Sequence, residues 1–197
     1  LRDAIEQLNI TSGFQPLADM GPLISAEHRQ SILDSIQKGV NEGATLTVDG
    51  RRFTPQPEDT GYFLGASLFD HVTDKMSIYQ NELFGPVLVV LRVPDYETGL
   101  KLINAHPYGN GATIFTQNGS IARNFSRNVA AGMVGVNVPI PVPIAAHPFG
   151  GWKRSSFGDC PMHGEEGLRF YTRSKSVTTR WSNQTPQQNH FSIPTHN

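Results

Sequence analysis

Cysteine is almost absent from this 197-residue chain, in which Cys160 is the only one. A single thiol cannot form a disulfide within its own chain, so a fold stabilised by internal disulfides is excluded. Chains with so little cysteine are typical of reducing compartments, where thiols persist without pairing. The composition therefore favours a reducing intracellular environment.

The sequence also has no large excess of charge of either sign and no long apolar run. Sixteen Lys and Arg face 17 Asp and Glu, for a formal net charge of -1. Such a balance creates no overall field that would attract nucleic acid or an anionic membrane. No apolar run approaches the roughly 20 residues that a membrane-spanning helix needs. We predict a soluble protein whose partner is a small molecule or another subunit.

Several motifs of known chemistry are missing as well. The chain has no Walker-type phosphate loop, no G-x-S-x-G elbow and no G-x-G-x-x-G between a strand and a helix. Cys160 and His163 are close enough in sequence to suggest an activated thiol or half of a metal site. No second cluster of Cys and His has a suitable spacing, and the remaining histidines are scattered. We therefore predict a structural Cys160, no metal site and no catalytic residue in this chain.

The chain begins with a short apolar stripe. Leu1, Ile5 and Leu8 share one helical face, and neither Met nor a targeting signal precedes them. We interpret this start as the cut or cleaved end of a larger polypeptide.

Helices and strands are predicted to alternate along most of the chain. A helix runs from the N-cap Ser25 to Gly43, and residues 44–48 predict a strand that turns at Asp49-Gly50 into a hairpin partner at 51–54. After a proline-rich loop at 55–60, strands are expected at 62–66, 86–93, 112–116 and 133–138, and helices at 95–105 and 120–130. This alternation predicts an α/β fold, with a mostly parallel sheet flanked by helices.

The last third of the chain has a different character. Prolines hold residues 137–151 extended, and a long ordered loop of this kind is more often functional than not. Alternating β-branched residues at 176–181 predict a late strand. The tail at 182–197 is rich in Gln, Asn and Pro, which predicts disorder. We divide the chain into an α/β domain at 1–170, a strand region at 171–181 and this tail.

Two pairs of residues suggest binding surfaces. Glu82 and Phe84 flank Leu83 just before a strand, where a carboxylate can accept both ribose hydroxyls of a nucleotide and a ring can cover its flat base. The alternative is a solvated Glu82 and a Phe84 packed in the core. Gly150 and Gly151 allow a close backbone approach, although a tight turn with buried aromatics would need the same residues.

Five short motifs, taken together and in order, resemble the C-terminal portion of the aldehyde dehydrogenase superfamily. They are NELFGPV at 81–87, PYG at 107–109, ATIFT at 112–116, GVN at 135–137 and PFGGWK at 148–153. The similarity covers the chain from about Leu1 to Trp181. Within that superfamily, GMVGVNVPIPVP at 132–143 and RSSFGD at 154–159 are similar to the methylmalonate-semialdehyde dehydrogenase branch. Asn110 agrees with this branch, because most relatives outside it have leucine there.

This resemblance implies the oxidation of an aldehyde by a cysteine thiolate, with NAD as hydride acceptor. In this branch coenzyme A then accepts the acyl group and carbon dioxide leaves. The resemblance implies that Glu82 holds the nicotinamide-ribose hydroxyls, that Phe84 packs near the nicotinamide ring, and that Pro143 and Phe149 line the aldehyde tunnel. The family's nucleophilic cysteine and dinucleotide-binding domain precede the matched segment, and Cys160 is in the wrong place to substitute. The chain alone is therefore expected to be inactive.

The same resemblance implies that 1–170 belongs to a catalytic domain and that 171–181 is an oligomerisation strand, which joins a neighbouring subunit's sheet in a dimer or tetramer. Pairing of this strand within its own chain is the alternative. The expected partners are a small semialdehyde and the rest of a parent polypeptide, with no nucleic acid and no membrane. The expected location is a bacterial cytoplasm or, alternatively, a mitochondrial matrix. Two alternative functions stay open. One is a hydrolytic aldehyde dehydrogenase, in which water accepts the acyl group, and the other is a non-catalytic assembly module.

Overall fold

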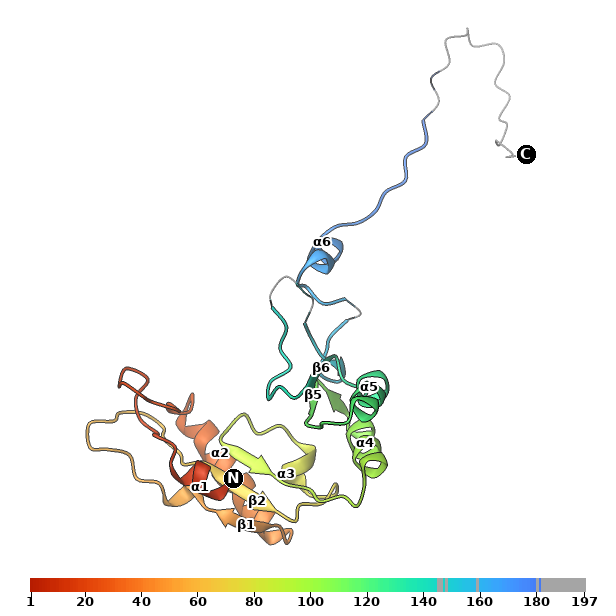
Figure 1. The fold of residues 1–197 in the computed structure, drawn as a ribbon. Coiled ribbons are helices and arrows are strands. Elements are labelled where there is room, and N and C mark those ends of the chain that lie inside the picture. Colours follow the sequence, from red (N-terminus) through yellow and green to blue (C-terminus); the bar gives the residue numbers. More distant parts are fainter. Residues whose placement is uncertain (145–146, 148, 159, 180, 182–197) are drawn as a thin grey trace. The chain divides into compact units, whose positions relative to one another are not determined.

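The computed structural model describes residues 1–144, 147, 149–158, 160–179 and 181, and the chain divides into two compact units (Figure 1). The first unit contains residues 1–142 and 150–157, and the second contains 143–149 and the residues after 157. Pro148 and Asp159 of the motifs, Arg180 of the predicted strand and the predicted disordered tail at 182–197 lie outside the described residues.

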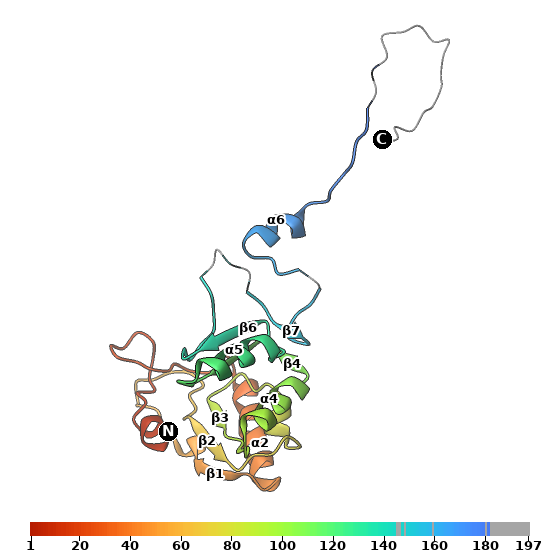
Figure 2. The same cartoon turned by 45° about the vertical axis from the view of Figure 1, so that its right-hand side comes forward.

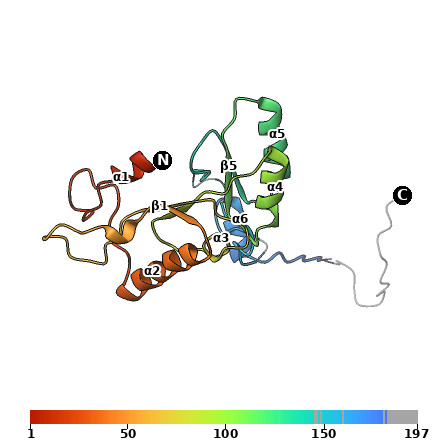
Figure 3. The ribbon, with the colours of Figure 1, turned by 90° about the horizontal axis from the view of Figure 1, so that it is seen from below.

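The first unit is built around a three-stranded sheet and one long helix. Strands β1 (Thr45–Val48) and β2 (Ser67–Asp70) pair antiparallel, and β2 pairs in parallel with β3 (Val87–Val89). Helix α2 (Ala26–Asn41) lies along this sheet (Figure 3). The core between them excludes water, because its most deeply buried side chains are at most 1% exposed; these are Ile32, Ile36 and Phe69.

A second layer of the same unit consists of two helices on two parallel strands. Helices α4 (Tyr96–Ala105) and α5 (Gly119–Asn128) lie side by side, and β5 (Gly111–Ile114) pairs with β6 (Met133–Val136) (Figure 2). Phe125 on α5 is 3% exposed and anchors the apolar cluster between these helices and β5.

Short elements complete the fold. The first unit also contains α1 (Arg2–Glu6), the 3-10 helix η1 (Gly50–Arg52), α3 (Ser77–Gln80), and the antiparallel pair β4 (Tyr108–Gly109) and β7 (Trp152–Lys153). The second unit contains α6 (Glu165–Tyr171), which the sequence analysis did not predict. No helix among the described residues is long and apolar enough to cross a membrane.

The three longer helices confirm the predictions at 25–43, 95–105 and 120–130 to within two residues at each end. Both predicted N-caps are present, because the side chain of Ser25 accepts from the His28 N–H and that of Asp95 accepts from the Thr98 N–H. The α/β fold class is confirmed. The described strands form three separate small sheets, with two parallel and two antiparallel pairings.

The predicted hairpin at Asp49-Gly50 is wrong. Residues 50–52 form η1, and β1 pairs with β2 rather than with residues 51–54. Asp49 accepts from the Arg51 N–H at 3.1 Å, which winds the chain into a helical turn. Gly50 packs so closely against the Gly65 carbonyl that a Cβ there would overlap it. A contact between distant segments thus decides against the local hairpin signal.

Two further strand predictions are wrong in position. No described residue at 62–66 belongs to a strand except for the bridge between Tyr62 and Leu23, and the strand forms at Ser67–Asp70 instead. The strand expected at 86–93 is shortened to Val87–Val89. Residues 172–179 are assigned no strand, so the alternative in which this segment pairs within its own chain is not observed there.

Candidate functional site

The loop at 81–86, between α3 and β3, is held through its backbone. The carbonyl of Phe84 accepts from Nε2 of His28 at 2.9 Å, and the Ser67 N–H donates to the Pro86 carbonyl at 2.8 Å. Gly85 packs directly on the core residue Ile32, where a Cβ would overlap Cδ1 of the isoleucine. The 81–86 loop is therefore positioned by α2 on one side and by β2 on the other.

The two predicted nucleotide-binding side chains of this loop point into solvent. The Phe84 ring is 77% exposed, which contradicts the alternative that it packs in the core, and Glu82 is exposed with no hydrogen-bond partner among the described residues. Phe84 has φ of +51°, in the left-handed region that costs a non-glycine residue about 1–2 kcal/mol. Backbone strain of this kind concentrates at functional sites. Both side chains are therefore accessible on the described part of the chain.

The predicted tunnel residues belong to the second unit. Pro143 is half-buried, and Phe149 stacks face to face on His163, with ring centroids 4.0 Å apart and an interplanar angle of 13°. One face of the Phe149 ring is thus covered by the imidazole. From the sequence, His163 was proposed only as a partner of Cys160, and this stacking was not predicted.

The proline-rich segment begins, within the first unit, at a turn formed by Asn137. This residue has φ of +57°, and its side-chain amide accepts from the Thr116 N–H at 2.8 Å and donates to the Thr116 carbonyl at 3.0 Å. The two bonds continue the β5–β6 ladder beyond its last backbone pair. Asparagine suits this position, because it tolerates the left-handed region better than other residues with a side chain. Asn137 therefore sets the direction in which the segment toward Pro143 begins.

The glycine pair of the PFGGWK motif makes the close approach that the sequence suggested. A Cβ on Gly132 would overlap the carbonyl of Gly150, and Trp152 is 56% exposed, so the alternative of buried aromatics does not hold for Trp152. Lys153 donates from Nζ to the carbonyls of Asn104 and His106, both at 3.0 Å, and so caps the end of α4.

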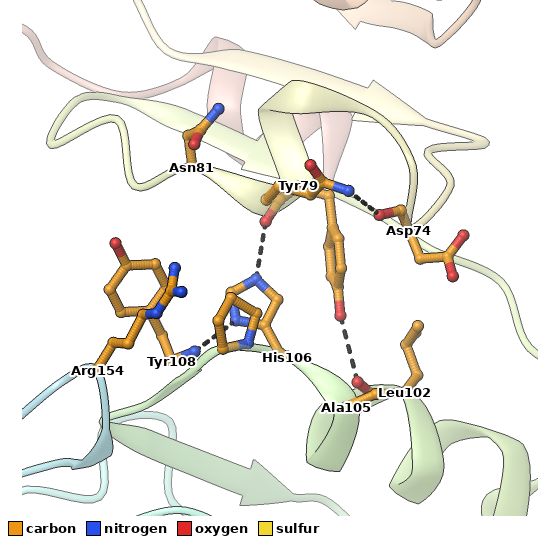
Figure 4. A pocket seen from close by; sticks show the side chains of 10 residues that line it. Asp74, Tyr79, Asn81, Leu102, Ala105, His106, Tyr108 and Arg154 are labelled. Atoms are coloured by element: carbon orange, nitrogen blue, oxygen red, sulfur yellow. Dashed lines mark hydrogen bonds between the residues drawn. The ribbon is translucent and has the colours of Figure 1, made fainter.

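A pocket of about 350 Å³ opens in the first unit beside the 81–86 loop (Figure 4). Its lining includes Asn81, Tyr108 and Arg154, and also His106, which lies beside Tyr108. The Tyr108 N–H donates to Nδ1 of His106 at 3.2 Å, so the proton lies on Nε2, which donates to the Tyr79 carbonyl at 3.1 Å. Both ring nitrogens of His106 therefore form hydrogen bonds to the backbone of other residues in the pocket lining.

A phenol completes this wall. Burial raises the pKa of Tyr79, with a smaller contribution from the nearby Asp74 carboxylate, so its hydroxyl stays protonated and donates to the Leu102 carbonyl at 3.5 Å. None of the four predicted site residues lines this pocket. We therefore assign it no part in the proposed site.

The structure thus places Glu82 and Phe84 on one loop whose backbone is anchored to α2 and β2. Pro143 and Phe149 lie in the second unit. Sequence reasoning missed His28, because the bond that matters joins it to a residue 56 positions away. Among the described residues, no three side chains of His, Cys, Asp and Glu gather as metal ligands would.

Comparison with protein families gives one match over nearly the whole described chain. The model described as the aldehyde dehydrogenase family matches residues 1–177. A malonate-semialdehyde dehydrogenase of Pseudomonas aeruginosa is 49% identical over 191 residues, which cover 96% of this chain and 38% of that protein. A malonate-semialdehyde dehydrogenase of Bacillus cereus is 47% identical over 176 residues, covering 89% of this chain and 36% of that protein.

Solved structures give the same picture. A methylmalonate-semialdehyde dehydrogenase from Sinorhizobium meliloti complexed with NAD superposes with a TM-score of 0.89 at 49% identity, covering 93% of this chain and 38% of that one. The methylmalonate-semialdehyde dehydrogenase of Oceanimonas doudoroffii has a TM-score of 0.88 at 46% identity, covering 92% of this chain and 37% of that one. The chain therefore spans less than two fifths of the length of these relatives.

Proposed function

Because the chain belongs to the aldehyde dehydrogenase family, we propose that it is the C-terminal part of an NAD-dependent, CoA-acylating malonate- or methylmalonate-semialdehyde dehydrogenase. The net reaction converts the semialdehyde, coenzyme A and NAD⁺ into acyl-CoA, carbon dioxide and NADH. The aldehyde carbon is oxidised as its hydride passes to NAD, and the carboxylate leaves as carbon dioxide. Relatives named for these two semialdehydes support the substrate class.

The observation that carries this proposal is the 81–86 loop. Its backbone is anchored to α2 and β2, while Glu82 and Phe84 are exposed and Phe84 has a positive φ. In the proposed site Glu82 accepts hydrogen bonds from the nicotinamide-ribose hydroxyls, and the Phe84 ring packs near the nicotinamide. NAD, when bound, is the hydride acceptor. The loop's contribution is orientation, because its backbone is held by hydrogen bonds to α2 and β2.

On the substrate side, we propose that Pro143 and Phe149 line the aldehyde tunnel. The His163 stack supports this role for Phe149, because it holds the ring in one orientation. Both residues are apolar, so they exclude water from the aldehyde carbon. Asn137 contributes indirectly, since it sets the start of the segment that carries Pro143.

The nucleophile is proposed to lie on polypeptide outside these 197 residues. Cys160 donates to the Glu166 carboxylate at 2.9 Å in the second unit. The chain alone is therefore expected to oxidise no aldehyde, and a purified sample that produced NADH from malonate semialdehyde would contradict this assignment.

Assembly is proposed to occur through residues 171–181, which would add a strand to a neighbouring subunit's sheet in a dimer or tetramer. Val177 is 76% exposed and Trp181 is 89% exposed, and side chains of this kind gain from being covered. Light scattering after size-exclusion chromatography tests this step, and a monomer would remove it. For location we propose a bacterial cytoplasm, in keeping with the bacterial relatives, with a mitochondrial matrix as the alternative.

The acyl acceptor is tested in the full-length enzyme by assaying NADH formation with and without coenzyme A. We expect turnover to depend on coenzyme A and the product to be an acyl-CoA. Free acid formed at the same rate without coenzyme A would instead identify a hydrolytic aldehyde dehydrogenase.

The cofactor role is tested by Glu82→Ala in the full-length enzyme, with Glu58→Ala, another exposed carboxylate, as control. Loss of a hydrogen bond donated to a charged acceptor costs about 1.5–3 kcal/mol, so the Kd for NAD should rise about 10- to 150-fold. Glu58→Ala should leave the Kd unchanged. An unchanged Kd in Glu82→Ala would remove Glu82 from the site.

A further inference from the structure

The loop proposed to bind the nucleotide has a strained conformation that needs an anchor. Phe84 has φ of +51°, and its ring is 77% exposed, so packing of the ring itself does not hold it in place. A contact that holds the peptide following Phe84 also influences the direction of the Phe84 ring and of the Glu82 carboxylate two residues earlier. The contacts of the Phe84 carbonyl therefore decide the geometry of the site.

That carbonyl accepts one side-chain hydrogen bond, from Nε2 of His28 at 2.9 Å. His28 is half-buried in the first turn of α2, and its own N–H donates to Oγ of the N-cap Ser25 at 3.1 Å. The donor thus stands on the capped first turn of a 16-residue helix. A ring fixed in this way can hold the peptide in one orientation.

A second contact from the same helix face supports the first. Ile32 follows His28 by four residues, so both side chains face the loop. Gly85 packs on Ile32 so closely that a Cβ would overlap Cδ1. The helix therefore holds the 84–85 peptide by a hydrogen bond at its oxygen and by packing at the next Cα.

We propose that His28 is a positioning residue for nucleotide binding, which holds the Phe84 peptide so that Glu82 and Phe84 face NAD together. This inference rests on the proposed function of the 81–86 loop. His28 itself touches neither nucleotide nor substrate in this proposal, and its effect passes through the loop. Its removal should therefore weaken NAD binding, which raises the KM for NAD and lowers the rate at subsaturating NAD, and should leave kcat at saturating NAD close to the wild-type value.

The test compares side chains at position 28 in the full-length enzyme. His28→Gln places an amide donor near the position of Nε2, whereas His28→Asn has the same amide but is too short to reach the Phe84 carbonyl. Loss of one net hydrogen bond corresponds to about a three- to tenfold rise in the Kd for NAD, measured by titration calorimetry. We expect this rise in His28→Asn and His28→Ala, and a Kd close to the wild-type value in His28→Gln. The control is Gln30→Ala on the same helix, where only a bond to Asp34 is lost.

A double-mutant cycle separates positioning from a general loss of stability. In the Phe84→Ala/Glu82→Ala background, a positioning role predicts that His28→Asn no longer changes the Kd for NAD, because the groups it orients are gone. Equal Kd values for His28→Gln and His28→Asn, or the same fold-change with and without Glu82 and Phe84, would overturn the proposal. If Glu82→Ala alone leaves NAD binding unchanged, the proposed function of the loop fails. If Glu82→Ala weakens binding and His28→Asn does not, only the role of His28 fails.

Discussion

The close contact between Gly85 and Ile32 can be tested by its effect on the stability of the fold, because a methyl group added at position 85 has no room. In Gly85→Ala the new Cβ overlaps Cδ1 of Ile32 and lies 3.1 Å from its Cγ1. Ile32 is 1% exposed and surrounded by the core of the first unit, so its side chain has little space to turn away. Overpacking of such a site costs about 1–3 kcal/mol.

The expected loss of stability in Gly85→Ala is judged against a glycine-to-alanine change whose added Cβ contacts no other atom. In Gly13→Ala the added Cβ has no heavy atom within 4 Å, so only the smaller entropy of the unfolded chain acts and the change should be neutral or slightly stabilising. For a protein of this size 1 kcal/mol shifts the melting temperature by about 2–4 °C. Gly85→Ala should therefore melt about 2–12 °C below wild type, and Gly13→Ala should not.

A second substitution tests whether Ile32 is the cause. Ile32→Val removes Cδ1, the overlapped atom, at its own cost of about 0.5–1.5 kcal/mol. In this background Gly85→Ala should cost less than about 1 kcal/mol, measured by differential scanning fluorimetry and urea unfolding. A penalty of the same size in both backgrounds, or a Gly85→Ala variant that melts like Gly13→Ala, would refute the reasoning.

Two other predictions concern the first unit. A hydrogen bond from Arg92 lowers the pKa of Asp70 from 3.8 to about 2. The stabilisation by this ion pair is therefore present above about pH 4 and is lost as the pH falls through 2. In urea unfolding at several pH values, Asp70→Asn should lose less stability than wild type across this window, and identical slopes would contradict the ion pair. Asn137→Ala loses both bonds to Thr116 and also the tolerance for φ of +57°, whereas Asn137→Gly loses the bonds alone. The alanine variant should therefore be about 1–2 kcal/mol less stable than the glycine variant in urea unfolding, and a more stable alanine variant would show that the turn is not left-handed.

The helices were predictable because the interactions that start them are local. Ser25 and Asp95 each cap a helix by accepting from an N–H three residues later, and this spacing is visible in the sequence. The strands were less predictable, because a strand depends on the partner it meets. Asp49-Gly50 has the composition of a hairpin turn, yet the approach of Gly65 and the capping by Asp49 turn the chain into η1.

For the candidate site, too, local features could be predicted from the sequence and contacts between distant residues could not. Residue type allowed Glu82 and Phe84 either to bind a nucleotide or to be a solvated carboxylate and a core ring, and the family motifs pointed to both of them and to Pro143 and Phe149. The positive φ of Phe84, the bond from His28 and the stacking of His163 on Phe149 came only from the folded chain. Local chemistry is written in neighbouring residues, whereas the orientation of a side chain depends on atoms that the fold brings from 56 residues away.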